Sequence, residues 1–265
     1  MIRADRPASR FASALLALAL AAPLQALCAE RAASAPVEDP MLVTAGFLDH
    51  HQDIKYRLMG LEAYKKRDFE NALRFFRRAG FYADKPAQGM VAEMYWNGDG
   101  VARDPALAYA WMDLAAERGY RGFLLLREKY WTALSAAERE RALAEGQALY
   151  ALFGDAAAKP RYEHKLRVGR REMTGSRTGF NRGVRIEIPG PAGEQAIEGS
   201  KYYDERYWDA KKYWAWQDRH WMKPKIGKVR IGELETTSIE STDSRIPKTA
   251  PQVDAQEPTV PPPPR

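Results

Sequence analysis

One helical pattern occurs more than once in this chain, and it limits the fold more than any other feature of the sequence. Residues 87–97 and 105–116 both place small and aromatic side chains at helical spacing, and the glycine-rich stretch NGDGVARD separates them. Self-similarity at a fixed offset is typical of stacked helical hairpins, so the pattern predicts a helical repeat. The pairs that share an offset of 36 residues are Ala72 and Ala108, Phe76 and Met112, and Ala79 and Ala115.

The stretch NGDGVARD has the residues of a hinge between two helices. Gly98 and Gly100 permit the positive φ that a chain adopts as it leaves a helix. Asp104 followed by Pro105 suits the start of the next helix. A phosphate loop would need a Lys-Ser/Thr end, and a calcium loop would need acidic residues at alternate positions. We therefore predict no ligand here and assign Asp99 to a solvated turn.

Weaker copies of the pattern flank this unit. Ser135 and Glu138 form an S-x-x-E capping box, which predicts a helix that ends near Gly154. Trp111 lies on the helical stripe of small residues, so we expect it in the core, facing Tyr95 of the preceding helix. Together these patterns predict three helical hairpins over residues 54–154. The tyrosines that close the first helix of each hairpin are Tyr64, Tyr95 and Tyr130.

The strongest unit resembles the Sel-one-like repeat, a branch of the tetratricopeptide-type α/α solenoids. Ala92 and Phe123 depart from the family pattern, which usually has Gly and Ala there. The resemblance implies a mainly α fold, a short solenoid of helical hairpins, and a scaffold or adaptor that binds a protein or peptide partner on its concave face. It brings no catalytic residues. The residues that carry it are Ala87, Val91, Tyr95, Gly98, Gly100, Val101, Asp104, Ala108, Trp111, Ala115, Ala116 and Gly119.

The resemblance also indicates which residues line the concave face, because the first helix of each hairpin forms that surface in such solenoids. The side chains two places before and one place after each marker tyrosine are then candidate partner-binding residues. Alternatively they are ordinary solvated positions, with Glu62 pairing to Lys66 across one helical turn. The candidates are Glu62, Lys65, Glu93, Trp96, Glu128 and Trp131.

The N-terminal residues 1–28 have the pattern of a secretory signal peptide. Three arginines in MIRADRPASR precede the apolar run FASALLALALAA, which is shorter than the ~20 residues of a membrane-spanning helix. We expect cleavage after Cys28 or Ala29, a periplasmic or secreted mature chain, and no transmembrane span in it. Because Cys28 is the one cysteine, disulfides and cysteine-ligated zinc are not expected. Residues 29–53 then form a linker and helical lead-in.

Residues 155–234 are predicted to form a basic, aromatic-rich module. Residues 160–231 contain 17 basic and 9 acidic residues within a chain of net charge +6. The alternating runs VRIEI and KVRIGEL predict a small β-ribbon, and residues 201–221 between them predict a helix. That helix either caps the solenoid or exposes an aromatic and cationic surface for glycan, lipid headgroups or protein. The residues assigned to this surface are Tyr207, Trp208, Trp214, Trp216 and Arg219.

The remaining features exclude some classes of function. Residues 235–265 lack aromatic residues and end in a proline run, so we expect a disordered tail. A secretory signal argues against nucleic acid as a partner. His50 and His51 are adjacent, and adjacent side chains diverge on a helix, so no metal site is expected. No catalytic set and no cofactor motif can be identified.

We therefore predict an exported, non-enzymatic scaffold of the cell envelope that binds a protein or peptide on its concave face. Peptidoglycan or another anionic envelope component is a further candidate partner, because aromatic and basic side chains suit such ligands. The alternative is an envelope-associated enzyme or enzyme subunit that binds or processes cell-wall glycan through the Trp- and Tyr-rich segment.

Overall fold

The computed structural model describes residues 45–174, 185–190, 193–222 and 238–259. The signal peptide and most of the lead-in lie outside these residues. The fold is mainly α, as predicted, and none of the described helices is long and apolar enough to cross a membrane. The helices of the repeat region are α2 (Ala45–His50), α3 (Gln52–Lys65), α4 (Phe69–Phe81), α5 (Lys85–Asn97), α6 (Pro105–Ala115), the 3-10 helix η3 (Ala116–Arg118), α7 (Arg121–Ala133) and α8 (Ala136–Phe153).

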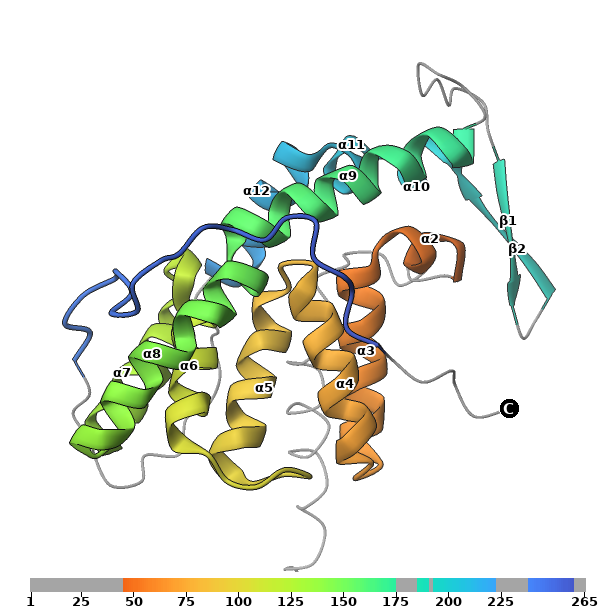
Figure 1. Ribbon diagram of the computed structural model, residues 1–265. Helices are drawn as coiled ribbons and strands as arrows, with labels where there is room; N and C mark the ends of the chain where they lie inside the picture. The colour runs from red at the N-terminus through yellow and green to blue at the C-terminus, as the bar shows by residue number, and fades with distance from the viewer. Residues whose placement is uncertain (1–44, 175–184, 191–192, 223–237, 260–265) are drawn as a thin grey trace, which may run out of the picture. The chain divides into compact units, whose positions relative to one another are not determined.

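Helices α3 to α6 form two successive hairpins that pack side by side (Figure 1). Small residues let the helices approach closely. A Cβ atom at Gly60 of α3 would lie 2.6 Å from the ring of Phe76 on α4, so only glycine fits there. The alanines of the repeated stripe, Ala79, Ala108 and Ala115 among them, are fully buried. The predicted stripe is therefore the core of the two hairpins.

The hinge between α5 and α6 has the predicted geometry. Gly98 ends α5 with φ +81°, and Asp104 accepts a hydrogen bond from the Leu107 amide at 3.0 Å as the N-cap of α6. Gly100 has φ +69°, and a Cβ atom there would lie 2.3 Å from Cβ of Phe69. One expectation was wrong: Asp99 is not merely solvated, because it accepts a hydrogen bond from the Tyr64 hydroxyl at 2.7 Å.

The third pair of helices departs from the hairpin pattern. Both α7 and α8 pack against α6, and α8 does so more extensively than α7. The capping box of Ser135 and Glu138 is present, and α8 ends before Gly154. Phe123 fits on α7 because it faces Gly89 of α5, where a Cβ atom would lie 2.8 Å from the Phe123 ring. The larger side chain is thus matched by a smaller neighbour.

After the repeats, the chain differs from the sequence-based expectation at several points. Helix α9 runs from Asp155 to Thr174 with Pro160 inside it, although a proline inside a helix removes a backbone hydrogen bond. Strand β1 (Arg185–Gly190) covers most of the predicted run VRIEI, and its antiparallel partner is β2 (Gly193–Glu198), which no pattern predicted. The run KVRIGEL, residues 228–234, lies outside the described residues.

Residues 201–221 do not form one helix. They lie in α10 (Gly199–Tyr202), α11 (Glu205–Trp208) and α12 (Ala210–Met222). Two aspartates account for the breaks, because each accepts a backbone N–H at a helix start: Asp204 from Arg206, and Asp209 from Lys212. The prediction of one helix over residues 201–221 was therefore wrong.

The C-terminal segment, which we define as residues 238–259, is placed along the repeats rather than free of them. It has no helix or strand, as its composition predicts, yet Ile246 is 2% exposed. In Figure 1 the segment is the dark blue trace that passes from α7 and α8 across α9 to α4. The expectation of disorder overlooked the polar contacts that hold it, which the next section describes.

Trp111 tests the predicted core. It is 1% exposed, and its ring centroid lies 4.7 Å from that of Phe153, whereas we expected Tyr95 as its neighbour. Trp111→Ala should lower the free energy of unfolding by ~3–5 kcal/mol, because it leaves a cavity where three helices meet. Urea unfolding followed by circular dichroism measures this loss. The half-buried Trp96→Ala should lose clearly less, and an equal loss in both variants would contradict the core assignment.

Candidate partner-binding surfaces

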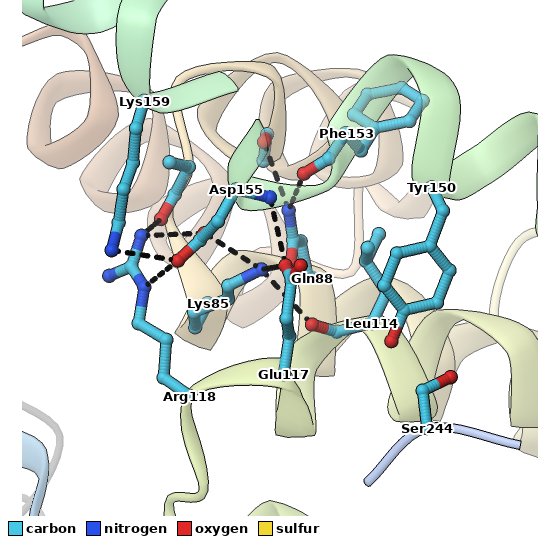
Figure 2. A network of polar contacts seen from close by, with 12 residues as sticks. Lys85, Gln88, Leu114, Glu117, Arg118, Tyr150, Phe153, Asp155, Lys159 and Ser244 are labelled. Carbon is cyan, nitrogen blue, oxygen red and sulfur yellow. Dashed lines mark hydrogen bonds and ion pairs between the residues drawn. The ribbon is translucent and has the colours of Figure 1, made fainter. Parts of the chain in front are cut away.

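A buried ion network fixes the frame that carries the candidate surfaces (Figure 2). The side chain of Lys85, at the start of α5, is fully buried. Its ammonium group lies 2.7 Å from a carboxylate oxygen of Glu117 and 3.1 Å from one of Asp155. It also donates to the Leu114 carbonyl at 3.1 Å. Beside it, the Gln88 amide donates to backbone carbonyls at the ends of α4 and α8.

Asp155 joins this network to the start of α9. Arg118 holds it through two hydrogen bonds, at 2.7 and 2.9 Å, and also donates to the Ala83 carbonyl. Burial opposes ionisation of Asp155, but Lys85 and Arg118 hold the pKa of that carboxyl well below its ordinary value. The network therefore links α5, η3 and α9, and it fixes the first residue of α9 against the repeats.

The inner-face strip, which we define as Tyr64, Glu93, Trp96, Asp99 and Tyr130, crosses α3, α5 and α7. Trp96 stacks on Tyr130 with ring centroids 3.9 Å apart and planes 6° apart. Burial, with Asp99 nearby, raises the pKa of Glu93, and burial with the Asp99 hydrogen bond raises the pKa of Tyr64 to about 12. Two neighbouring carboxyls beside an aromatic stack suit a partner that donates hydrogen bonds.

The six predicted concave-face residues divide into two groups. Glu93 and Trp96 belong to the inner-face strip and are half-buried, while Glu62 and Lys65 are exposed near the end of α3. Glu62 pairs with Lys66 at 3.1 Å, which confirms the alternative interpretation for that residue. Glu128 and Trp131 lie elsewhere, because the C-terminal segment covers them.

Arg245 of the C-terminal segment occupies the site formed by Glu128 and Trp131. Its guanidinium donates to both carboxylate oxygens of Glu128, at 2.9 and 2.7 Å, and lies 5.0 Å from the centre of the Trp131 ring. Arg127 donates to Glu128 as well, at 2.7 Å. Burial acts to raise the pKa of Glu128, but the two arginines outweigh it, so the pKa of Glu128 lies below its ordinary value. Glu128 is 2% exposed, so it is not the solvated position that sequence alone allowed.

The predicted aromatic and cationic surface is not a surface. Four of its five residues are buried, and only Arg219 is exposed. The reason is that α12 packs against α3 and α9: Tyr213 bonds to Asp53 on α3, and the Trp214 indole donates to Glu163 on α9 at 2.8 Å. The crevice between α12 and the starts of α5 and α7 has no room for a water molecule. The buried residues are Tyr207, Trp208, Trp214 and Trp216.

The histidines and carboxylates do not combine into a metal site within the part of the chain that the structure describes. His51 is buried, and its two ring nitrogens lie 2.9 Å from the carbonyl oxygens of Phe47 and Tyr207. It therefore ties α2 to α11 rather than pointing at a ligand. Burial lowers the pKa of His51, while the carbonyl oxygens of Tyr207 and Phe47 and the nearby Asp53 act in the opposite direction.

Sequence reasoning missed the residues that hold the C-terminal segment. Asp113 and Arg127 are buried polar side chains on helices α6 and α7, and Arg161 lies on α9. An aspartate on the apolar stripe of α6 was the one available signal, because a buried carboxylate needs a partner. Gly146 on α8 gave no such signal, since a glycine inside a helix has many causes.

The Lys85 network is testable by removing its cation. Lys85→Met should lower the free energy of unfolding by ~3–5 kcal/mol, because it leaves the largely buried Glu117 without its closest cation. Lys66→Met is the control, since Lys66 and Glu62 are exposed and such pairs contribute ~0–1 kcal/mol. Chemical denaturation measures both losses. Similar small losses in both variants would show that the network is not essential.

The same network predicts a dependence on pH. The pKa of Asp155 is lower in the folded chain than in the unfolded chain, where an aspartate has a pKa of ~3.9. Its contribution is therefore present above ~pH 4 and is lost as the pH falls through the lower, folded-state value. In Lys85→Met the pKa of Asp155 should rise toward the unfolded-state value, so Asp155 should contribute a smaller loss of stability on acidification. Unfolding curves measured at several acidic pH values test this, and identical acid profiles would contradict it.

Comparison with known proteins agrees with the two hairpins. The family model described as Sel1 repeat matches residues 56–80 and 85–120, which correspond to α3–α4 and α5 through η3. Helices α7 and α8, whose packing departs from the hairpin pattern, lie outside the match. Among curated proteins and solved structures, none matches the chain significantly. The chain therefore contains Sel1 repeats, in a helical solenoid of the kind that generally binds protein partners.

Proposed function

We propose that this protein is an exported scaffold whose inner-face strip binds a protein or peptide partner in the cell envelope. The observation that carries the proposal is the strip itself. It joins α3, α5 and α7, the first helix of each predicted hairpin, through the Trp96–Tyr130 stack and the Tyr64–Asp99 hydrogen bond. A surface that runs across successive repeats is the usual means by which solenoids bind extended partners.

The chemistry of the strip indicates the kind of partner. Glu93 and Asp99 are half-buried carboxyls, and the pKa of Glu93 is raised because burial and the neighbouring charge disfavour its ionised form. A lysine, an arginine or a backbone N–H from a partner would relieve both effects. The stacked rings of Trp96 and Tyr130 add an apolar element to the strip, and the Arg103 guanidinium lies 5.5 Å from the centre of the Trp96 ring. We therefore favour a partner segment that combines basic and apolar side chains.

The glycan-processing alternative loses its structural basis. It required the Trp- and Tyr-rich segment to be an accessible surface, but these side chains pack α12 and α11 into the fold. Export remains part of the proposal because residues 1–28 combine a basic start, a short apolar run and small residues near the expected cleavage site.

Crosslinking in the native envelope tests the proposed surface. A photo-reactive amino acid at position 65, beside the strip, should crosslink to a specific protein that mass spectrometry identifies. In a Glu93→Lys/Trp96→Ala background this product should fall at least several-fold, because charge complementarity and the aromatic contact are both lost. The control is Glu140→Lys, which reverses an exposed charge on α8. Equal losses in both backgrounds would contradict the assignment.

Export is tested separately. The mature protein is expected in the periplasmic or secreted fraction, with an N-terminus near Cys28 or Ala29. N-terminal sequencing of the purified native protein measures this. An intact Met1 on a protein recovered from the cytoplasm would contradict the proposal.

A further inference from the structure

The C-terminal segment is held in the way that a short linear peptide is held by a receptor. It has no helix or strand, and of its residues 238–259 only Ile246 is buried. Most of its other contacts are hydrogen bonds and ion pairs with side chains and backbone carbonyls of the repeat helices and α9. The segment groove, as we call this site, is lined by Asp113, Arg127, Glu128, Gly146 and Arg161.

The first specific contact is ionic. Glu128 accepts two hydrogen bonds from Arg245, a bidentate arrangement that a lysine could not reproduce. The Glu128 side chain is 3% exposed, and a buried carboxylate at this position is costly unless cations satisfy it. Trp131 adds a cation–π contact to the same guanidinium. The groove therefore selects arginine at this point.

The next two contacts select the neighbours of that arginine. The Ser244 hydroxyl donates to Asp113, a buried carboxylate that also accepts from the Tyr150 hydroxyl at 2.9 Å. Ile246 enters a notch at Gly146, where a Cβ atom would lie 2.5 Å from its Cδ1 atom. The groove thus distinguishes three successive side chains: a hydroxyl, a guanidinium and a branched aliphatic group.

Other contacts are made only to backbone atoms of the C-terminal segment, as expected for a site that accepts an extended chain. Arg127 donates to the carbonyls of Ser241 and Asp243, the latter at 3.0 Å. Further along, the backbone N–H of Gln252 donates to the Ala151 carbonyl at 2.7 Å. Arg161 donates to the backbone carbonyl of Gln252, also at 2.7 Å. These bonds position a peptide without depending on its sequence.

The segment buries one apolar side chain, Ile246, and its remaining contacts are hydrogen bonds and ion pairs, some of them partly exposed, such as Lys248 with Glu117. Because the segment belongs to the same chain as the groove, it competes with a separate peptide as an intramolecular ligand. A partner segment that makes the same three contacts can therefore compete with it.

We propose that the segment groove is a second binding site, distinct from the inner-face strip, for an extended peptide with serine or threonine, arginine and a branched aliphatic residue in succession. The chain's own Ser244, Arg245 and Ile246 occupy it as a tethered competitor. A partner then occupies the groove only if it binds with high affinity or is present at high local concentration. Its binding releases the C-terminal segment.

The test uses the full mature chain and a fluorescent synthetic peptide with the sequence of residues 238–259. Arg245→Glu/Ile246→Asp in the protein should release its own segment. Fluorescence anisotropy should then show peptide binding on the order of tenfold tighter, or more, than to the wild type, because the tethered competitor is gone. A peptide that carries the same two substitutions should not bind.

A matched variant distinguishes this groove from any other site. Gly146→Ala, made in the released protein, should abolish peptide binding, because the three atoms nearest to the new Cβ all belong to Ile246. Helix α8 should remain folded, since alanine has a higher helix propensity than glycine.

Four results would overturn the proposal. The first is a released protein that binds no peptide, and the second is a released protein that fails to fold, which would make the segment an integral part of the domain. Peptide binding unaffected by Gly146→Ala would place the site elsewhere. A wild-type dimer that the released variant cannot form, measured by light scattering, would mean that copies exchange their segments.

Discussion

The buried ammonium group of Lys85 is the interaction on which the rest of the structure depends. Removing an ammonium ion from water costs several kcal/mol, so it must be surrounded by carboxylates and carbonyls. The groups that satisfy it come from η3 and the first residue of α9. Helix α9 is thereby anchored at Asp155, and it supplies Glu163 to α12 and Arg161 to the C-terminal segment.

Two segments that follow the repeats cover different parts of them. Helix α12 lies near the starts of α3 and α7. Its Tyr213 bonds to Asp53 on α3, and the hydroxyl of Tyr120, the residue before α7, donates to Asp218 of α12. The C-terminal segment contacts α6, α7, α8, α9 and α4. The inner-face strip is formed by the later parts of α3, α5 and α7. One small solenoid thus presents two surfaces with different chemistry.

The candidate site could be predicted only in part. Counting from the marker tyrosines placed Glu93 and Trp96 on one face of α5, and both are half-buried there, because helices repeat with a fixed period. The same counting placed Glu128 and Trp131 on that surface, whereas Arg245, more than a hundred residues later, covers them. The aromatic residues of α11 and α12 were misassigned for a related reason. Their burial depends on α9 and α3, whose positions no local pattern encodes.

The sequence by itself determined the hairpins, the hinge and the helix ends. Gly98, Gly100, Asp104 and the Ser135 capping box act within a few residues, through backbone dihedrals and local hydrogen bonds, so their effect is readable from the chain. Long-range packing decided that α8 lies on α6, that the aromatic side chains of α12 are buried, and that the C-terminal segment is docked. These depend on buried charges and on gaps such as the one at Gly146, whose partners lie far away in sequence.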